Sequence, residues 1–79
     1  MGVAVHVRAA GHLRQRMPGG QAEMDLELAE GSSVLNLLTH LGLHKSQVWI
    51  VRINGEPASH EDRLAAGDSV ELFPLVGGG

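Results

Sequence analysis

The stretch EGSSVLNLLTHLGL, residues 30–43, is where the hydrophobic period of the sequence changes. Before it, apolar and acidic residues alternate. Within it, apolar residues recur three and four positions apart, as on one face of a helix: Val34, Leu37, Leu38 and Leu41. Ser32 or Ser33 can cap the first turn, and Gly42 can take the left-handed conformation that ends a helix. The sequence therefore predicts one short helix, stabilised by burial of its leucines at about 1.5–3 kcal/mol each.

Two alternating segments precede this helix. Residues 3–8 place valines at every second position, and residues 22–28 oppose Met24, Leu26 and Leu28 to acidic neighbours. Both are typical of strands with one buried face. The polar connection between them, residues 11–20, ends in a proline and two glycines, which is a strong turn signal. We therefore expect a hairpin whose acidic face lies in water.

The segment after the helix, residues 48–53 (VWIVRI), is apolar on both faces of an extended chain. This is typical of a central strand. Trp49 shares the parity of the later valine and isoleucine of this segment, so we expect it in the core. Asn54 and Gly55 then form a dipeptide typical of a tight hairpin turn.

The remainder of the chain is a polar loop followed by one more strand. Residues 56–67 are loop-like, with a short edge strand and a helical turn expected near residues 62–64. Residues 69–73 alternate again, and Pro74 should end this strand because proline cannot donate a ladder hydrogen bond. The predicted order is strand, strand, helix, strand, short element, strand.

Phe73 is the residue of the last strand that we single out. If Val70 and Leu72 face the core, Phe73 points to the opposite face, since successive side chains alternate. An outward phenylalanine beside the C-terminal tail would then be an anchor for partner proteins. The alternative is that Phe73 belongs to the core, because a slip of one residue reverses the parity.

Composition limits the classes of function. The 79 residues make one domain with a net charge of −3, and the six Lys and Arg residues form no cluster, which argues against nucleic acid as a partner. No apolar stretch approaches the roughly 18 residues of a membrane span, and no signal peptide is visible, so we expect a cytoplasmic protein. The chain has no cysteine. Any sulfur chemistry must therefore use sulfur supplied by another molecule.

Four stretches carry a resemblance to a known family. They are GHLRQ (residues 11–15), LAEGSSVLNLLTHLGL (28–43), INGEP (53–57) and LAAGDSVELFPLVGGG (64–79). In this order, with a diglycine end, the chain resembles the ThiS/MoaD-like sulfur carriers, and most of all the small subunit of molybdopterin synthase. The family often has an aromatic residue where this chain has Ala9 and Ala10, and alanine or serine in place of Gly77.

The resemblance implies a fold as well as a domain organisation. We expect an α+β protein with the ubiquitin-like β-grasp fold, in which a mixed sheet of four to five strands packs on one main helix. Residues 1–74 would form the β-grasp domain. Residues 75–79 would form an extended, flexible glycine tail.

The chemistry that the resemblance implies takes place at the C-terminus. The carboxylate of Gly79 would be adenylated by an E1-like adenylyltransferase that uses ATP, and a persulfide sulfur donor would then convert it to a thiocarboxylate. The sulfur would be delivered to the large subunit of molybdopterin synthase or another sulfur-accepting enzyme. The carrier would bind no cofactor and would not itself be an enzyme. No catalytic triad, paired-carboxylate or metal motif stands out in the sequence.

The tail has to reach into pockets of these partners. Five residues, 75–79, can extend roughly 16 Å. Gly77 and Gly78 lack a Cβ atom and can pass a constriction that would exclude other residues. Ordering the tail costs about 1–2 kcal/mol per residue, which apolar contacts must offset. Phe73, Pro74, Leu75 and Val76 are the expected partner-binding residues.

Several alternatives stay open. The chain could be a carrier for thiamine or for cysteine and methionine synthesis, although the late position of Asn54 and Gly55 favours the molybdopterin type. It could also be a ubiquitin-like modifier conjugated through Gly79, or a binding module without chemistry. The terminal glycines could be a cloning remnant.

The histidines and the loop acids have simpler interpretations. His40 and His44 are four residues apart, but Gly42 should end the helix between them, so we expect no metal site there. We expect the other histidines, His6, His12 and His60, at the surface as well. The acidic residues Glu56, Glu61, Asp62 and Asp68 should be solvated loop charges, or could help dock a basic face of the activating enzyme.

Overall fold

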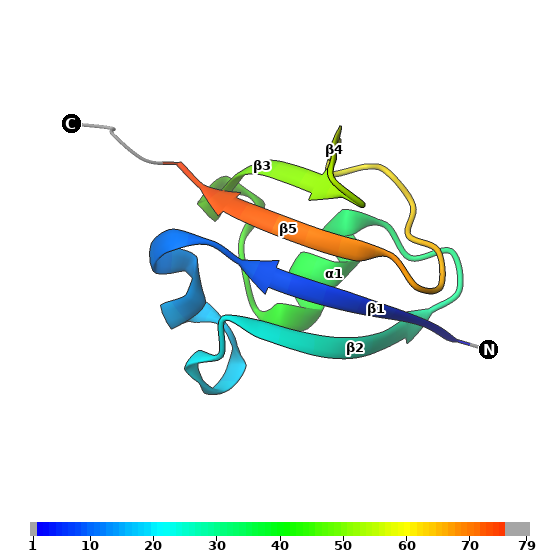
Figure 1. The fold of residues 1–79 in the computed structure, drawn as a ribbon, viewed down its shortest axis with the longest axis horizontal. Coiled ribbons are helices and arrows are strands. Elements are labelled where there is room, and N and C mark those ends of the chain that lie inside the picture. The colour runs from blue at the N-terminus through cyan, green and yellow to red at the C-terminus, as the bar shows by residue number, and fades with distance from the viewer. Residues whose placement is uncertain (1, 76–79) are drawn as a thin grey trace.

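The computed structural model describes residues 2–75, and Met1 and residues 76–79 lie outside the described part. One five-stranded sheet, ordered β2-β1-β5-β3-β4, packs with one face on a single α-helix (Figure 1). This confirms the predicted α+β class and the predicted order of elements. The bounds are β1 (Gly2–Ala9), β2 (Glu23–Ala29), α1 (Val34–Leu41), β3 (Val48–Ile53), β4 (Glu56–Ala58) and β5 (Ser69–Pro74).

The first and last strands lie side by side in the middle of the sheet. β1 pairs antiparallel with β2, with Val5 opposite Leu26, and parallel with β5, with Val7 opposite Val70. The predicted hairpin is therefore confirmed. The expectation that residues 48–53 form a central strand is confirmed, because β3 lies between β5 and the short edge strand β4.

Helix α1 begins and ends where the sequence predicts. The Ser33 hydroxyl accepts a hydrogen bond from Asn36 N at 3.3 Å, and Asn36 Oδ1 accepts one from Ser33 N at 2.8 Å, a reciprocal capping box. At the other end Gly42 takes the left-handed conformation with φ of 78°. Ser33 is thus the cap among the two serines proposed.

The loop after β4 supplies further acceptors to the start of α1. Val34 N donates to the carbonyl of Asp62 at 2.9 Å, and Leu35 N donates to that of His60 at 3.0 Å. Arg63 forms an isolated antiparallel bridge with Ser33. The predicted helical turn near residues 62–64 is wrong: the turn lies at residues 60–61, where Asp62 N donates to the carbonyl of Ser59 at 3.1 Å.

The core lies between α1 and one face of the sheet. Its members come from every strand except the short β4, from α1, and from the connections, where Leu13, Met17, Leu43 and Leu64 are buried. Leu13 belongs to the 3₁₀ turn η1 (Gly11–Arg16), and Met17 lies just before η2 (Pro18–Gly20). The first connection, predicted as a polar loop, is therefore tied to the core by two apolar side chains.

The β3–β4 hairpin turns as the Asn-Gly dipeptide predicts. Asn54 and Gly55 have φ values of 54° and 83°, both in the left-handed region that a tight two-residue turn requires. The Asn54 side chain also reaches β5, since Ser69 N donates to its Oδ1 at 2.9 Å. This bond joins the turn to the first residue of β5.

Candidate functional site

The C-terminal end of β5 leads directly to the tail. Val70 and Leu72 are fully buried, and Phe73 lies on the opposite, uncovered face of the sheet. The predicted parity of this strand is thus confirmed, while the role of Phe73 in partner binding stays a prediction. β5 ends at Pro74, which is buried, and Leu75 is 57% exposed. The other predicted tail residues, Val76, Gly77, Gly78 and Gly79, lie outside the described residues.

Trp49 is at the surface, and the prediction that it is a core residue is wrong. It is 58% exposed and the next residue, Ile50, is 40% exposed, whereas Val48 and Val51 are buried. The cause is an irregularity in the β3–β5 register: Val48 pairs with Pro74 and Ile50 with Phe73, so Trp49 is one extra residue in β3. Such a bulge places two consecutive side chains on one face and reverses the parity that follows.

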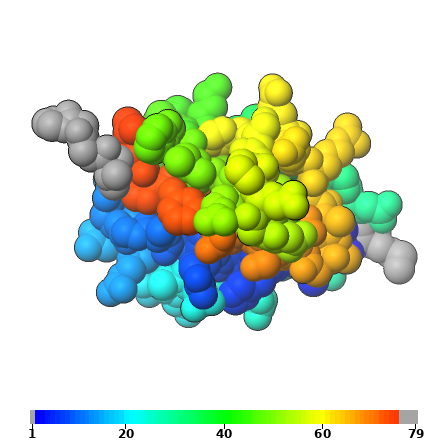
Figure 2. Space-filling model, turned by 45° about the horizontal axis from the view of Figure 1, so that its top comes forward, coloured from blue at the N-terminus to red at the C-terminus, as the bar shows by residue number. Residues whose placement is uncertain are grey.

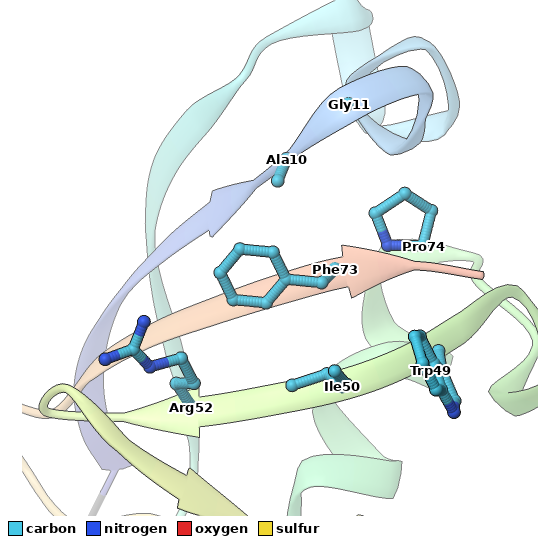
Figure 3. A pocket seen from close by; sticks show the side chains of 7 residues that line it. All are labelled: Ala10, Gly11, Trp49, Ile50, Arg52, Phe73 and Pro74. Atoms are coloured by element: carbon cyan, nitrogen blue, oxygen red, sulfur yellow. The ribbon is translucent and has the colours of Figure 1, made fainter. Parts of the chain in front are cut away.

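The bulge forms one wall of an apolar groove on the open sheet face. The groove has a volume of about 470 Å³ and lies at the surface near the end of β5. In Figure 2 the end of β5, in orange-red, lies between the first connection in blue and β3 in green. In Figure 3, Phe73 lies between Ala10 on one side and Ile50 on the other. The lining residues are Ala10, Gly11, Trp49, Ile50, Arg52, Phe73 and Pro74.

The first connection and β5 approach closely at one end of this groove. Ala10 N donates to the carbonyl of Leu72 at 2.9 Å, which extends the pairing of β1 with β5. Gly11 has φ of 57°, and a Cβ atom placed on it would lie 3.2 Å from Cγ of Pro74. A side chain at position 11 would therefore require Pro74 to shift by a few tenths of an ångström, on a left-handed backbone that favours glycine.

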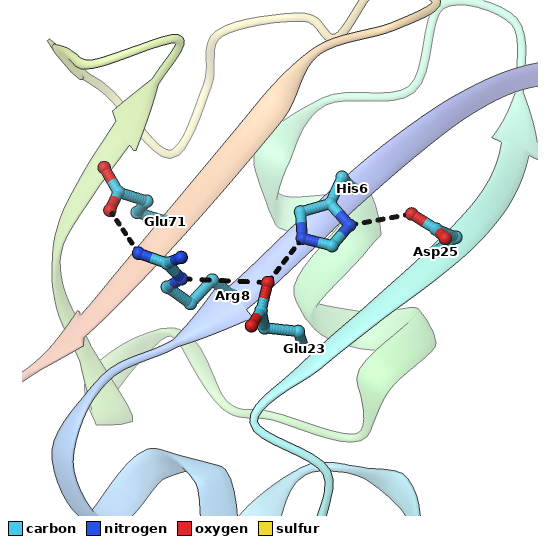
Figure 4. Close-up of polar contacts among 5 residues, drawn as sticks. All are labelled: His6, Arg8, Glu23, Asp25 and Glu71. Carbon is cyan, nitrogen blue, oxygen red and sulfur yellow. Dashed lines mark hydrogen bonds and ion pairs between the residues drawn. The ribbon is translucent and has the colours of Figure 1, made fainter.

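A row of alternating charges crosses the same face beside the groove (Figure 4). His6 contacts Asp25 and Glu23 on β2 at 2.7 and 2.8 Å. Arg8 lies 3.9 Å from Glu23 and 3.7 Å from Glu71, and Arg52 lies 4.0 Å from Glu71. We call the six residues, Asp25, His6, Glu23, Arg8, Glu71 and Arg52, the charged row. It contains three carboxylates and three basic side chains and ends at the groove.

His6 is the titrating member of the charged row. The hydrogen bond to Asp25, followed by that to Glu23, raises the pKa of His6 above its ordinary value of 6.5. Both ring nitrogens face a carboxylate, and only the protonated imidazole can donate from both. The charge of this face is therefore sensitive to pH.

Two of the four loop acids do more than carry charge. Asp68 accepts hydrogen bonds from the Asn54 side chain at 3.0 Å and from Ala65 N at 2.8 Å, and Asp62 accepts one from Ser59 N at 3.0 Å. These carboxylates hold the loop between β4 and β5. The role in docking that we considered for the loop acids stays a prediction.

The histidines converge on no metal site within residues 2–75. In that part of the chain, no group of three or more histidine, cysteine, aspartate or glutamate side chains is placed to hold a metal ion. His40 lies in α1 and His44 beyond Gly42, where its Nδ1 accepts from Ser46 N at 3.1 Å and caps the 3₁₀ turn Lys45–Gln47.

None of the helices described is long and apolar enough to cross a membrane.

Sequence reasoning identified Phe73 and Pro74 but missed the rest of the groove. Trp49 was missed because nothing in an apolar run marks where a bulge will reverse the parity. Arg52 has the outward parity that the sequence predicts, but no local pattern links it to Phe73. Ala10 was noted only as a departure from the family. The contact of His6 with Asp25 could have been found, since a hairpin register that aligns the valines of β1 with the apolar residues of β2 sets these two opposite each other.

Comparison with known proteins agrees with this geometry. The sequence model of the ThiS family matches residues 10–79, most of the chain, and the match includes the end of β5 and the terminal glycines. The chain belongs to the ThiS family. Proteins of this family are non-catalytic sulfur carriers that bind no cofactor and generally act with an E1-like activating partner.

Solved structures show the same fold. A Pyrococcus furiosus protein described as subunit 1 of a molybdopterin converting factor is 27% identical, with a TM-score of 0.73 over 94% of this chain and 99% of the other. Small archaeal modifier protein 1 of Haloferax volcanii is 22% identical, with a TM-score of 0.77 over 95% and 100%. Its namesake from Methanosarcina acetivorans is 21% identical, with a TM-score of 0.73 over 100% and 99%.

Proposed function

We propose that this ThiS-family protein is a cytoplasmic carrier that donates sulfur in molybdopterin biosynthesis, as the small subunit of molybdopterin synthase. Its reactive group is the carboxylate of Gly79. The observation that supports this best is the family match, which extends from residue 10 through the glycine end. The central position of β5 adds a mechanical reason, because the strand that leads to the tail is held by neighbours on both sides.

Activation of Gly79 needs a partner enzyme, since a carboxylate is a poor electrophile. An oxygen of the carboxylate attacks the α-phosphorus of ATP in the E1-like enzyme, pyrophosphate leaves, and an acyl adenylate forms. A persulfide of the sulfur donor then attacks the acyl carbon and AMP leaves. A thiol reduces the resulting acyl disulfide, which yields the thiocarboxylate and a disulfide on the donor side. The absence of cysteine from this chain requires both the sulfur and the thiol to come from partners.

The thiocarboxylate is the form in which sulfur reaches the substrate. Its sulfur is a soft nucleophile that attacks an electrophilic carbon of the pterin precursor in the large subunit, and an oxygen substituent of that carbon leaves. Hydrolysis of the acyl linkage then leaves sulfur on the substrate and restores the carboxylate of Gly79. The 27% identity with the Pyrococcus furiosus protein favours this pathway over thiamine or cysteine and methionine synthesis.

A second candidate is a protein modifier joined to lysines through Gly79. We consider this candidate because the chain has the same fold as the small archaeal modifier proteins. It shares the adenylation step with the carrier. The two functions differ in what attacks the activated carbonyl: a persulfide in the carrier and a lysine amine in the modifier.

The test is the intact mass of the chain after incubation with an E1-like enzyme, ATP and a persulfide donor. A gain equal to one oxygen replaced by one sulfur supports the carrier, and addition of the large subunit with the pterin precursor should reverse it. Conjugates linked to lysine would support the modifier. An unchanged mass with E1-like enzymes of every sulfur-carrier pathway would contradict both.

Deletion of Gly79 is the matching control. The variant should fold as the wild type does, because β5 ends at Pro74 and the core uses no residue beyond it among those described. It should not be activated. A variant that still gains sulfur would move the reactive group away from the terminal carboxylate.

A further inference from the structure

The groove lies just before the tail, at Phe73 and Pro74. If the proposed function is right, a partner enzyme must lie against this groove whenever Gly79 is in its catalytic centre. Leu75 is the last described residue, and four residues separate it from the carboxylate of Gly79. At about 3.3 Å per residue these span roughly 13 Å. The catalytic centre of the activating enzyme must therefore approach within that distance of Leu75. Its surface then lies against the groove, because Phe73 and Pro74 line it.

The shape of the groove fits a side chain that projects from a protein surface. Its volume of about 470 Å³ is within the range of binding pockets, but its walls come from a single sheet face and the start of the first connection. The lining is apolar apart from Arg52 (Figure 3). A small-molecule site would offer several convergent polar groups, which these seven residues do not provide.

Arg52 gives the rim of the groove a positive charge in a fixed position. Its Nη2 donates to the carbonyl of Gly55 at 2.8 Å, and its Nε lies 4.0 Å from Glu71. A guanidinium has five N–H donors, so further donors remain for a carboxylate of a partner. Tryptophan and arginine are also the residues that most often dominate binding energy at interfaces. Trp49 and Arg52 therefore make this groove a strong candidate for a binding hot spot.

Ala10 determines how deep the groove is. It faces the open side of the sheet next to Phe73 and contributes only a methyl group (Figure 3). A large side chain at this position would occupy the space between Phe73 and the first connection. The groove is thus open because position 10 is small, while Trp49 extends its opposite wall.

We propose that the groove is a socket for one large apolar side chain of the E1-like activating enzyme, with an enzyme carboxylate placed beside Arg52. Ala10 is the specificity-determining residue of this socket. An enzyme whose docking surface carries the projecting side chain binds this carrier well. An enzyme shaped for a carrier with a bulky residue at position 10 leaves the socket empty and binds it weakly.

The first experiment fills the socket. The variant Ala10→Phe is assayed by adenylation with the E1-like enzyme that activates the wild-type chain, with carrier concentration varied. The KM for the carrier should rise at least about tenfold, while kcat at saturation stays close to the wild-type value, because the tail and Gly79 are unchanged. Trp49→Ala, which removes the opposite wall, should raise the KM in the same way.

The matched control is Ala4→Phe. Ala4 is exposed, lies on β1 and has the same parity as Ala10, so it faces the same side of the sheet away from the groove. This variant should keep the wild-type KM. Thermal unfolding of all three variants distinguishes loss of docking from loss of fold, and Ala10→Phe and Trp49→Ala should melt close to the wild type.

The salt dependence of the KM tests the carboxylate beside Arg52. Raising the ionic strength should raise the wild-type KM, because the charge pair is screened. Arg52→Gln should have a higher KM at low salt and a weaker dependence on salt. If the KM of the wild type and that of Arg52→Gln depend equally on salt, no enzyme carboxylate pairs with Arg52, and that part of the proposal is wrong.

Trp49 gives a readout that does not depend on activity. It is the single tryptophan of the chain, so incorporation of fluorotryptophan places one fluorine label in the groove wall. Addition of the enzyme without ATP should shift the fluorine resonance, and Ala10→Phe should require at least about tenfold more enzyme for the same shift. A shift that depends on carrier concentration alone would mean that a second copy of the chain fills the groove, which would overturn the proposal.

The outcomes separate this inference from the proposed function. If the wild type gains sulfur but Ala10→Phe and Trp49→Ala keep the wild-type KM and the label does not shift, the socket is wrong and the carrier function stands. If the label shifts only with the sulfur-accepting subunit, the assignment to the activating enzyme is wrong. If no enzyme activates the wild type, both proposals fail together.

Discussion

His6 on β1 and Asp25 on β2 stand directly opposite each other, and Nδ1 of His6 lies 2.7 Å from Oδ1 of Asp25. Its other ring nitrogen faces Glu23, at 2.8 Å. The imidazole can satisfy both carboxylates only when it is protonated. One side chain thus decides whether the charged row is balanced or carries one excess negative charge.

The first prediction concerns the pH dependence of stability. The pKa of His6 is raised in the folded protein by Asp25 and then Glu23, so the folded state binds a proton more tightly than the unfolded state. The resulting stabilisation should be fully present below pH 6.5 and should be lost as the pH rises through the folded pKa. Denaturant unfolding of the wild type and His6→Gln at about pH 5.5 and about pH 8.5 measures it.

The variant His6→Gln should show a smaller loss of stability over this interval than the wild type does. His12→Gln is the control, since His12 is an exposed residue of the first connection. It should keep the wild-type pH dependence. An NMR titration that places the pKa of His6 at or below 6.5 would contradict the assignment of the charged row.

The second prediction concerns the close approach of the first connection to β5. Gly11→Ala places a Cβ atom 3.2 Å from Cγ of Pro74 on a backbone with φ of 57°. The left-handed conformation costs about 1–2 kcal/mol for a residue with a Cβ atom, and the contact adds to that cost. Gly20→Ala is the matched control, because φ there is 71° and no atom lies within 4 Å of the added Cβ. Gly11→Ala should lower the free energy of unfolding more than Gly20→Ala does.

The parts of the fold that the sequence predicts are those that local patterns determine. The alternation of β1 and β2, the apolar face of α1 with Ser33 and Gly42 at its ends, and the Asn-Gly turn all act over a few residues. The order of strands in the sheet depends on contacts across the whole chain. The apolar run of β3 predicts a strand with neighbours on both sides, but nothing in it indicates that these neighbours are β5 and β4.

The candidate site also depends on a contact between distant segments that a local sequence pattern does not predict. Phe73 was predicted on the open face from parity within β5, where the alternation is unbroken. Trp49 was predicted in the core by the same reasoning, and the extra residue in β3 reversed it. A bulge is a property of two paired strands, so the sequence of one of them does not reveal it.

The third prediction tests the N-terminal cap of α1. Ser33→Ala removes the acceptor for Asn36 N and should lower the free energy of unfolding by about 1 kcal/mol. Ser33→Asp keeps an acceptor at the cap and adds a negative charge near the helix N-terminus, so it should retain most of the stability. Thermal or denaturant unfolding of the two variants distinguishes them. An unchanged free energy of unfolding in Ser33→Ala would mean that the cap contributes nothing beyond the acceptors from His60 and Asp62.

The fourth prediction separates the two faces of β5. Leu72→Ala opens a cavity in the core and should cost about 2–5 kcal/mol, because Leu72 is fully buried. Phe73→Ala should cost clearly less, since Phe73 lies on the uncovered face, yet it should weaken binding of the activating enzyme. Unfolding by denaturant gives the stabilities, and the KM for the carrier in the adenylation assay gives the binding effect. If Phe73→Ala unfolds the domain, or leaves the KM unchanged, Phe73 is a structural residue and not a partner anchor.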